Sequence, residues 1–133
     1  MIPWSVKQDL KELALSHAEQ VRSSRHAAII SYKGNQVSWG VNRYKTHPIM
    51  LQYQRNEQAI FLHAETDAIK NALKERDDLS RCSLYVLRIK KDDDRKTNIC
   101  GIAKPCIGCM KAISTFGIKS VKYTLDNNGY GVL

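Results

Sequence analysis

The sequence has 133 residues, 43% of them hydrophobic and 26% charged, which is typical of one globular domain with its own core. Seven Gly and three Pro exclude a collagen-like or linker-rich chain. Lys and Arg number 21 against 13 Asp and Glu, so the formal net charge is +8 and favours an anionic partner such as a nucleotide, a nucleic acid or a membrane surface. We predict a single domain over residues 1–133.

Cysteine usage and hydropathy bear on location. The N-terminal residues show no basic stretch followed by an apolar run, and no apolar window approaches the roughly 20 residues that span a bilayer. Four cysteines without a secretion signal are more typical of thiols or metal ligands than of a disulfide framework. We therefore predict a cytoplasmic protein with no membrane partner.

Hydrophobic periodicity predicts a helix and then a β-hairpin at the start of the chain. Apolar residues at steps of three and four indicate a helix over 5–22, with Ser5 as its N-cap. Residues 26–32 and 36–41 are rich in strand-forming residues and flank a turn at 33–35, which is typical of a hairpin.

The next stretch, 42–58, shows no clear period and is predicted to be a long functional loop with room for one helical turn. Beyond it the chain alternates between helical and extended patterns. The remaining predicted elements are a helix over 64–73, a buried strand over 84–89, a charged loop over 90–96, a helix over 106–116 with Pro105 at its first turn and Gly117 after its end, a strand over 120–125 and an edge strand over 130–133. This order predicts an α/β fold with a central mixed β-sheet of four to five strands flanked by helices.

Two motifs at predicted helix starts carry the chemistry. One is His63–Glu65 and the other is Pro105–Cys109. Cysteines three apart at a helix start share one face near unpaired N–H groups, which favour the thiolates that zinc needs. One imidazole from the other helix gives three protein ligands and leaves a fourth position for water, as in catalytic zinc sites. Zinc lowers the pKa of such a water to about 7, and Glu65 can reach it to move its proton.

The H-x-E and P-C-x-x-C pattern resembles the cytidine/deoxycytidylate deaminase superfamily over nearly the whole chain, in motif and in element order. The resemblance implies a cytidine-deaminase-like three-layer fold. It implies one catalytic Zn²⁺ bound by His63, Cys106 and Cys109. It also implies that Glu65 is the catalytic proton shuttle in a hydrolysis that replaces a ring amino group and releases ammonia.

The same resemblance suggests substrate contacts. Gly40–Asn42 is similar to the family's G-x-N, whose Asn amide holds a sugar hydroxyl, so we expect this role for Asn42. The N–H of Ala64 is expected to contact the base carbonyl. Arg43 and Lys45 lie just past Asn42, where a 5′-phosphate would be within reach.

The identity of the base is inferred from residues at and between the zinc ligands. The H-A-E form has His63 in place of the Cys that is usual in free-cytidine deaminases, so it points to dCMP, tRNA adenosine, guanine and AID/APOBEC deaminases. Gly108 departs from the Met that is typical of the tRNA adenosine and guanine groups. Residues 42–48 and 117–123 look most like short dCMP-deaminase-like proteins of the kind found in viruses. We therefore expect conversion of dCMP to dUMP, by an enzyme that forms a homo-oligomer.

Four further interpretations remain open. The substrate could be cytosine or adenine in RNA or single-stranded DNA, where the basic surface would bind the backbone. The zinc could be structural, with Cys82 or Cys100 as a fourth ligand, in a non-catalytic nucleic-acid-binding module. Arg25 and His26 are second candidates for the phosphate contact, and the long charged connection over 90–104 is a candidate for shaping specificity.

Overall fold

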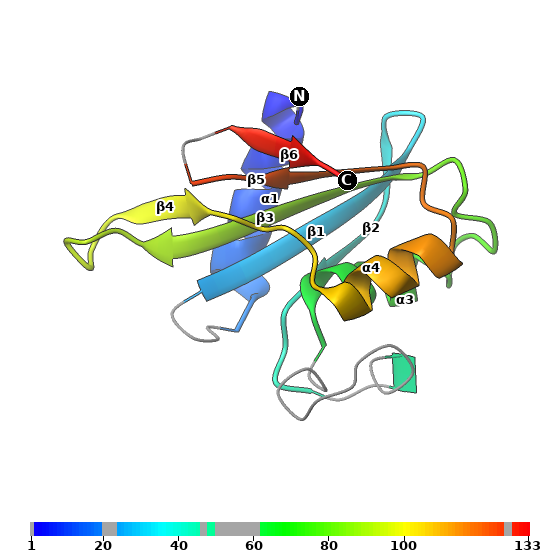
Figure 1. Cartoon of the computed structure of the whole chain (residues 1–133), viewed down its shortest axis with the longest axis horizontal. Helices are drawn as coiled ribbons and strands as arrows, with labels where there is room; N and C mark the ends of the chain where they lie inside the picture. The colour runs from blue at the N-terminus through cyan, green and yellow to red at the C-terminus, as the bar shows by residue number, and fades with distance from the viewer. Residues whose placement is uncertain (1, 20–23, 46–47, 50–61, 127–128) are drawn as a thin grey trace.

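The computed structural model describes residues 2–19, 24–45, 48–49, 62–126 and 129–133 (Figure 1). Its elements are α1 (Trp4–His17), β1 (Ser24–Tyr32), β2 (Asn35–Val41), α3 (Ala64–Ala72), β3 (Ser83–Lys91), β4 (Asn98–Gly101), α4 (Ile107–Thr115), β5 (Ser120–Thr124) and β6 (Tyr130–Val132). Helix α1 lies behind the sheet, and α3 and α4 lie together in front of it (Figure 1). The predicted three-layer α/β fold is confirmed. Among the described residues no helix is both long and apolar enough to cross a membrane.

The sheet has six strands in the order β2-β1-β3-β5-β6, and β4 pairs with β3 beside β5. The first half of β3 pairs in parallel with β5, and its second half pairs antiparallel with β4. All other pairs are antiparallel, so the sheet is mixed, as predicted. It has one strand more than the four to five expected.

Each face of the sheet has its own core, because side chains alternate along a strand. Ala27 and Ile29 of β1 belong to the cluster under α1, with Leu10 and Ala14 of that helix. Their neighbours Ala28 and Ile30 belong to the cluster under α3 and α4. The opposite faces of one strand thus hold helices from distant parts of the sequence.

The extra strand, β4, lies within the charged connection over 90–104, where no strand was predicted, and residues 92–97 form the loop between β3 and β4. Strand β3 continues to Lys91, and the chain turns back so that Asn98–Gly101 pairs with Arg88–Lys91. The Asp94 carboxylate accepts hydrogen bonds from the backbone N–H groups of Lys96 and Thr97, which stabilises the turn. Cys100 is buried in the core under α1. The sequence did not indicate β4 because this short strand has few apolar residues and follows a charged turn.

The first helix is also shorter than predicted. The Lys7 N–H donates to the Pro3 carbonyl, so Pro3 is the N-cap and Ser5 lies inside the helix. The helix ends at His17 because Ala18 is extended, and the Arg25 side chain donates to the Ala18 carbonyl. Positions 20–22 of the predicted helix, like 46–47 and 50–58 of the predicted loop, lie outside the described residues.

The predicted elements in the second half of the chain are otherwise confirmed within one or two residues. Helix α4 begins at Ile107 with Cys106 as N-cap, so Pro105 precedes the helix instead of lying in its first turn. Gly117 follows the end of this helix with a φ of 66°, which glycine adopts readily. Strand β6 pairs with β5 as the predicted edge strand.

Candidate active site

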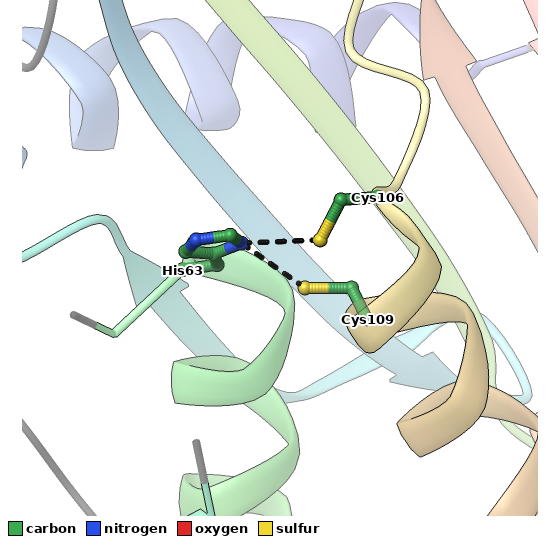
Figure 2. Close-up of side chains that lie close together, drawn as sticks. All are labelled: His63, Cys106 and Cys109. Carbon is green, nitrogen blue, oxygen red and sulfur yellow. Dashed lines mark hydrogen bonds between the residues drawn. The ribbon is translucent and has the colours of Figure 1, made fainter. Parts of the chain in front are cut away.

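The predicted metal ligands converge at the N-terminal ends of α3 and α4 (Figure 2). His63 Nδ1 lies 3.5 Å from Cys106 Sγ and 3.4 Å from Cys109 Sγ. The three donor atoms all lie within 4.8 Å of one another. Neither Cys82 nor Cys100 belongs to this group, so in the described part of the chain a four-ligand structural site is not formed.

These distances fit one zinc ion. With Zn–N of about 2.0–2.1 Å and Zn–S of about 2.3 Å, a tetrahedral ion holds its nitrogen and sulfur ligands about 3.6 Å apart. The observed separations are within about 0.2 Å of that value. His63, Cys106 and Cys109 are therefore positioned to bind a metal ion, with the three-ligand set of a catalytic zinc site.

Helix geometry places the three donors. His63 is the N-cap of α3 and Cys106 is the N-cap of α4, and neither side chain caps its own helix. Both side chains therefore turn toward each other across the gap between the helices (Figure 2). Cys109 lies in the first turn of α4 and is fully buried.

The seating of α3 on the sheet depends on Gly40 of β2. A Cβ there would lie 2.2 Å from the Ala68 nitrogen and 2.5 Å from the Ala64 carbonyl oxygen. Only glycine permits this close approach of helix and strand backbones. The buried Asp67 side chain adds a second link, because it accepts a hydrogen bond from the Val41 N–H. These contacts bring His63 to its place beside α4.

A pocket of about 290 Å³ opens next to the metal ligands. That volume is near the lower end of the range for small-molecule sites. The described residues that line it are Ser24, His26, Asn42, Arg43, Leu62, His63, Ala64, Glu65, Arg88, Ile102, Ala103, Lys104 and Cys106. Glu65 is the one carboxylic acid among these lining residues, against three basic side chains, Arg43, Arg88 and Lys104.

Four of the five predicted groups other than the metal ligands line this pocket: Glu65, Ala64, Asn42 and Arg43. Lys45 does not belong to the lining described; its side chain is exposed, and its carbonyl accepts a hydrogen bond from the Leu62 N–H.

Asn42 is held at both ends of its side-chain amide. Its Oδ1 accepts from the His26 N–H at 2.7 Å, and its Nδ2 donates to the Glu19 carbonyl. Arg43, one residue later, forms a salt bridge with the buried Asp67, with Nε 3.2 Å from Oδ2. Lys70 Nζ lies 3.0 Å from the other oxygen of Asp67. The acid that ties α3 to β2 thus also orients Arg43.

Sequence reasoning missed the wall of the pocket that the sheet provides. Ser24 and Arg88 were not predicted, and Lys104 was included only as part of the connection over 90–104. His26 was only a second candidate for the phosphate contact. Arg88 and Lys104 belong to the region around the unpredicted strand β4. Reading a polar residue inside a buried strand as a functional signal could have found Arg88, but nothing in the sequence placed it beside His63.

The buried groups of the site have shifted pKa values. Burial raises the pKa of Glu65, against the opposing effect of His63. A hydrogen bond with Cys106 and then burial raise the pKa of the Cys109 thiol well above its usual range. Burial, followed by the charges of Arg88 and His63, lowers the pKa of His26 to about 4, so its imidazole is neutral at pH 7. A bound metal cation lowers the pKa of the cysteine thiols again, because coordination deprotonates them.

Comparisons with known proteins agree with this geometry. The family model for the cytidine and deoxycytidylate deaminase zinc-binding region matches residues 5–125. No curated protein matches the sequence.

Two solved structures share the fold. The dCMP deaminase from the cyanophage S-TIM5 is 20% identical, with a TM-score of 0.56 over 93% of this chain and 86% of that one. Cytidine deaminase from Burkholderia pseudomallei is 14% identical, with a TM-score of 0.66 over 100% of this chain and 92% of that one. The donor set, the pocket and the family match together lead to one conclusion: this chain belongs to the cytidine/deoxycytidylate deaminase family and is a zinc-dependent deaminase.

Proposed function

We propose that the protein hydrolyses the amino group of a cytosine nucleotide, converting dCMP to dUMP and ammonia. The observation that carries the proposal is the pocket itself, which places the zinc-ligand set and Glu65 beside Arg43, Arg88 and Lys104. A deaminase site with three cations in its lining is suited to a substrate that carries negative charge.

Glu65 is the proposed proton carrier. When bound by His63, Cys106 and Cys109, zinc supplies Lewis acidity and lowers the pKa of a coordinated water to about 7. The buried Glu65 carboxylate accepts the proton of the attacking water and returns it to the leaving amino nitrogen. Burial raises the pKa of Glu65, which makes its carboxylate a stronger base toward the proton of the water.

The other predicted contacts orient the substrate. The Ala64 N–H is in the first turn of α3, where backbone donors have no partner within the helix, and we assign it to the base carbonyl. We assign a sugar hydroxyl to Asn42, whose amide is fixed by His26 and Glu19. Arg43 and Lys45 remain our candidates for the 5′-phosphate, and Arg43→Ala should raise KM for a nucleotide more than for its nucleoside.

Two observations make dCMP the first substrate to test. The cationic pocket favours a phosphorylated ligand over a free nucleoside. The cyanophage enzyme that shares the fold was also solved with dCMP and dUMP, at 19% identity and a TM-score of 0.54 over 94% of this chain and 85% of that one. The predictions of a viral source, a cytoplasmic location, a single domain over residues 1–133 and a homo-oligomer stay predictions.

The test is ammonia release from dCMP, dCTP, cytidine, adenosine, guanine and short oligonucleotides, with wild type and Glu65→Gln. We expect dCMP to give the highest kcat/KM, and the variant to keep its zinc while kcat falls by about a thousandfold. Turnover of oligonucleotides but not dCMP would support the nucleic-acid alternative instead. A Glu65→Gln protein as active as wild type would contradict the assigned role.

A further inference from the structure

Two paired residues of the sheet line one wall of the pocket, and a third residue pairs with one of them. His26 of β1 lies opposite Arg88 of β3, and Arg88 lies opposite Gly101 of β4. His26 and Arg88 both line the pocket, and the charges of Arg88 and His63 both act on His26. Arg88 therefore lines the pocket beside His26, and β1 separates it from β2 and the Arg43 that follows.

Two neighbours hold the Arg88 side chain in place. Its Nε donates a hydrogen bond to Ser24 Oγ at 2.8 Å, and Ser24 is itself buried. Across the hairpin, a Cβ at Gly101 would lie 3.1 Å from Arg88 Cδ and 3.3 Å from its Nε. Because Gly101 has no side chain, the Arg88 stem can occupy the space beside it. The Ser24 hydrogen bond and the Gly101 contact together orient the guanidinium.

Among the described residues, none neutralises the charge of Arg88. Its hydrogen-bond partner Ser24 is an uncharged hydroxyl, and in the described part of the chain it forms no ion pair. Arg43, in contrast, shares the buried Asp67 carboxylate with Lys70. A half-buried guanidinium whose Nη donors have no partner among the described residues calls for an anion, and its planar fork suits the oxygens of a phosphate. Lys104 adds a second cation to the same pocket.

We infer that Arg88 is the main contact to the substrate phosphate, with the Asp67-paired Arg43 as a second contact, and that it sets the preference of the enzyme for nucleotides over nucleosides. Ser24 and Gly101 are its positioning residues. The inference rests on the proposed function, which supplies the cytosine nucleotide, and assigns its anionic group to the β1–β3–β4 wall. The ligand is the phosphate monoester of a free nucleotide.

The test compares dCMP with deoxycytidine, which differ only by the phosphate, on zinc-loaded protein. We expect Arg88→Gln to lower the ratio of kcat/KM for dCMP to that for deoxycytidine by about tenfold or more. Gly101→Val keeps the arginine but fills the space of its stem, and should lower the same ratio. Lys90→Gln is the matched control: Lys90 is two residues along β3, on the same face of the sheet, and outside the lining of the pocket.

An unchanged ratio in Arg88→Gln, with zinc content and melting temperature like those of wild type, would overturn the inference. So would a variant that loses oligonucleotide turnover while the dCMP preference stays intact. If Lys90→Gln lowered the ratio as much as Arg88→Gln, the change in net charge alone would explain the loss, and the inference would also be overturned.

Failure of the proposed function gives a different result, namely no turnover of either substrate by wild type. The Arg88 assignment is then decided by calorimetric affinities of dCMP and deoxycytidine for wild type and Arg88→Gln, both loaded with zinc. A tenfold loss of the phosphate's contribution to affinity supports it, and identical affinities overturn it.

Discussion

The metal ligands and the sheet wall face each other across one pocket but are built differently. The ligands lie at two helix N-termini, where a single turn of backbone fixes each donor, and a close helix–strand contact brings them together. The wall includes Ser24 and His26 of β1, Arg88 of β3 and Lys104 after β4, which come from separate segments of the chain. Changes on the helix side should therefore abolish the chemistry, whereas changes on the sheet side should alter which substrate is preferred.

The largest effect is expected from removing a metal ligand. Cys109→Ala takes away a fully buried donor, so zinc should be lost and deaminase activity should fall by at least about a thousandfold. Zinc content and ammonia release measure both effects. Cys100→Ala is the control, since this buried thiol lies in the core under α1, and it should keep its zinc. Full zinc content in Cys109→Ala would show that another ligand set operates.

Gly40→Ala tests how the helix side is held. The added Cβ would overlap the backbone of α3, so we expect a loss of about 3 kcal/mol in the free energy of unfolding, together with weaker zinc binding because His63 begins that helix. Gly34→Ala in the hairpin turn is the control. It has a φ of 79° and open space around it, so only the backbone strain of about 1 kcal/mol applies. Equal losses in chemical denaturation would contradict the close-contact argument.

Zinc affinity should depend on pH through protonation of the ligands. Because the hydrogen bond with Cys106 and burial raise the pKa of Cys109, the metal must displace a proton from this thiol at neutral pH. Apparent affinity should thus fall as pH falls, by about tenfold per pH unit for each proton released. Competition with a chelator between about pH 6 and 8 measures the slope. A flat profile would mean that the thiols are already ionised.

The smallest effect is expected on the sheet side, at Lys90. Its Nζ lies 3.0 Å from Asp126 Oδ1, and both side chains are substantially exposed to solvent. Lys90→Gln should lower the free energy of unfolding by less than about 1 kcal/mol. Thermal melts at low and high salt measure this, and a loss above 2 kcal/mol would show that β3 depends on surface charge.

The sequence predicted features that depend on local interactions better than features that depend on contacts between distant segments. Hydrophobic patterns placed most elements within one or two residues, because each helix buries one apolar stripe and the central strands bury both faces as continuous apolar runs. Strand β4 was missed because Ile99 and Cys100 are flanked by a charged turn, and only pairing with β3 makes these residues extended. Ser5 was wrongly assigned as an N-cap, because the helix starts earlier, at Trp4.

The sequence by itself determined the donor set. His63 and Glu65 are two residues apart, and Cys106 and Cys109 are three apart, so the chemistry of each motif depends on one helical turn and is local. Tertiary structure alone decided that His63 Nδ1 lies 3.4–3.5 Å from the sulfurs of Cys106 and Cys109. It also decided that Arg88 of β3 lines the same pocket. The physical reason is that strand register and the Gly40 contact join segments far apart in the chain, and no local pattern of residues encodes which of their side chains face one another.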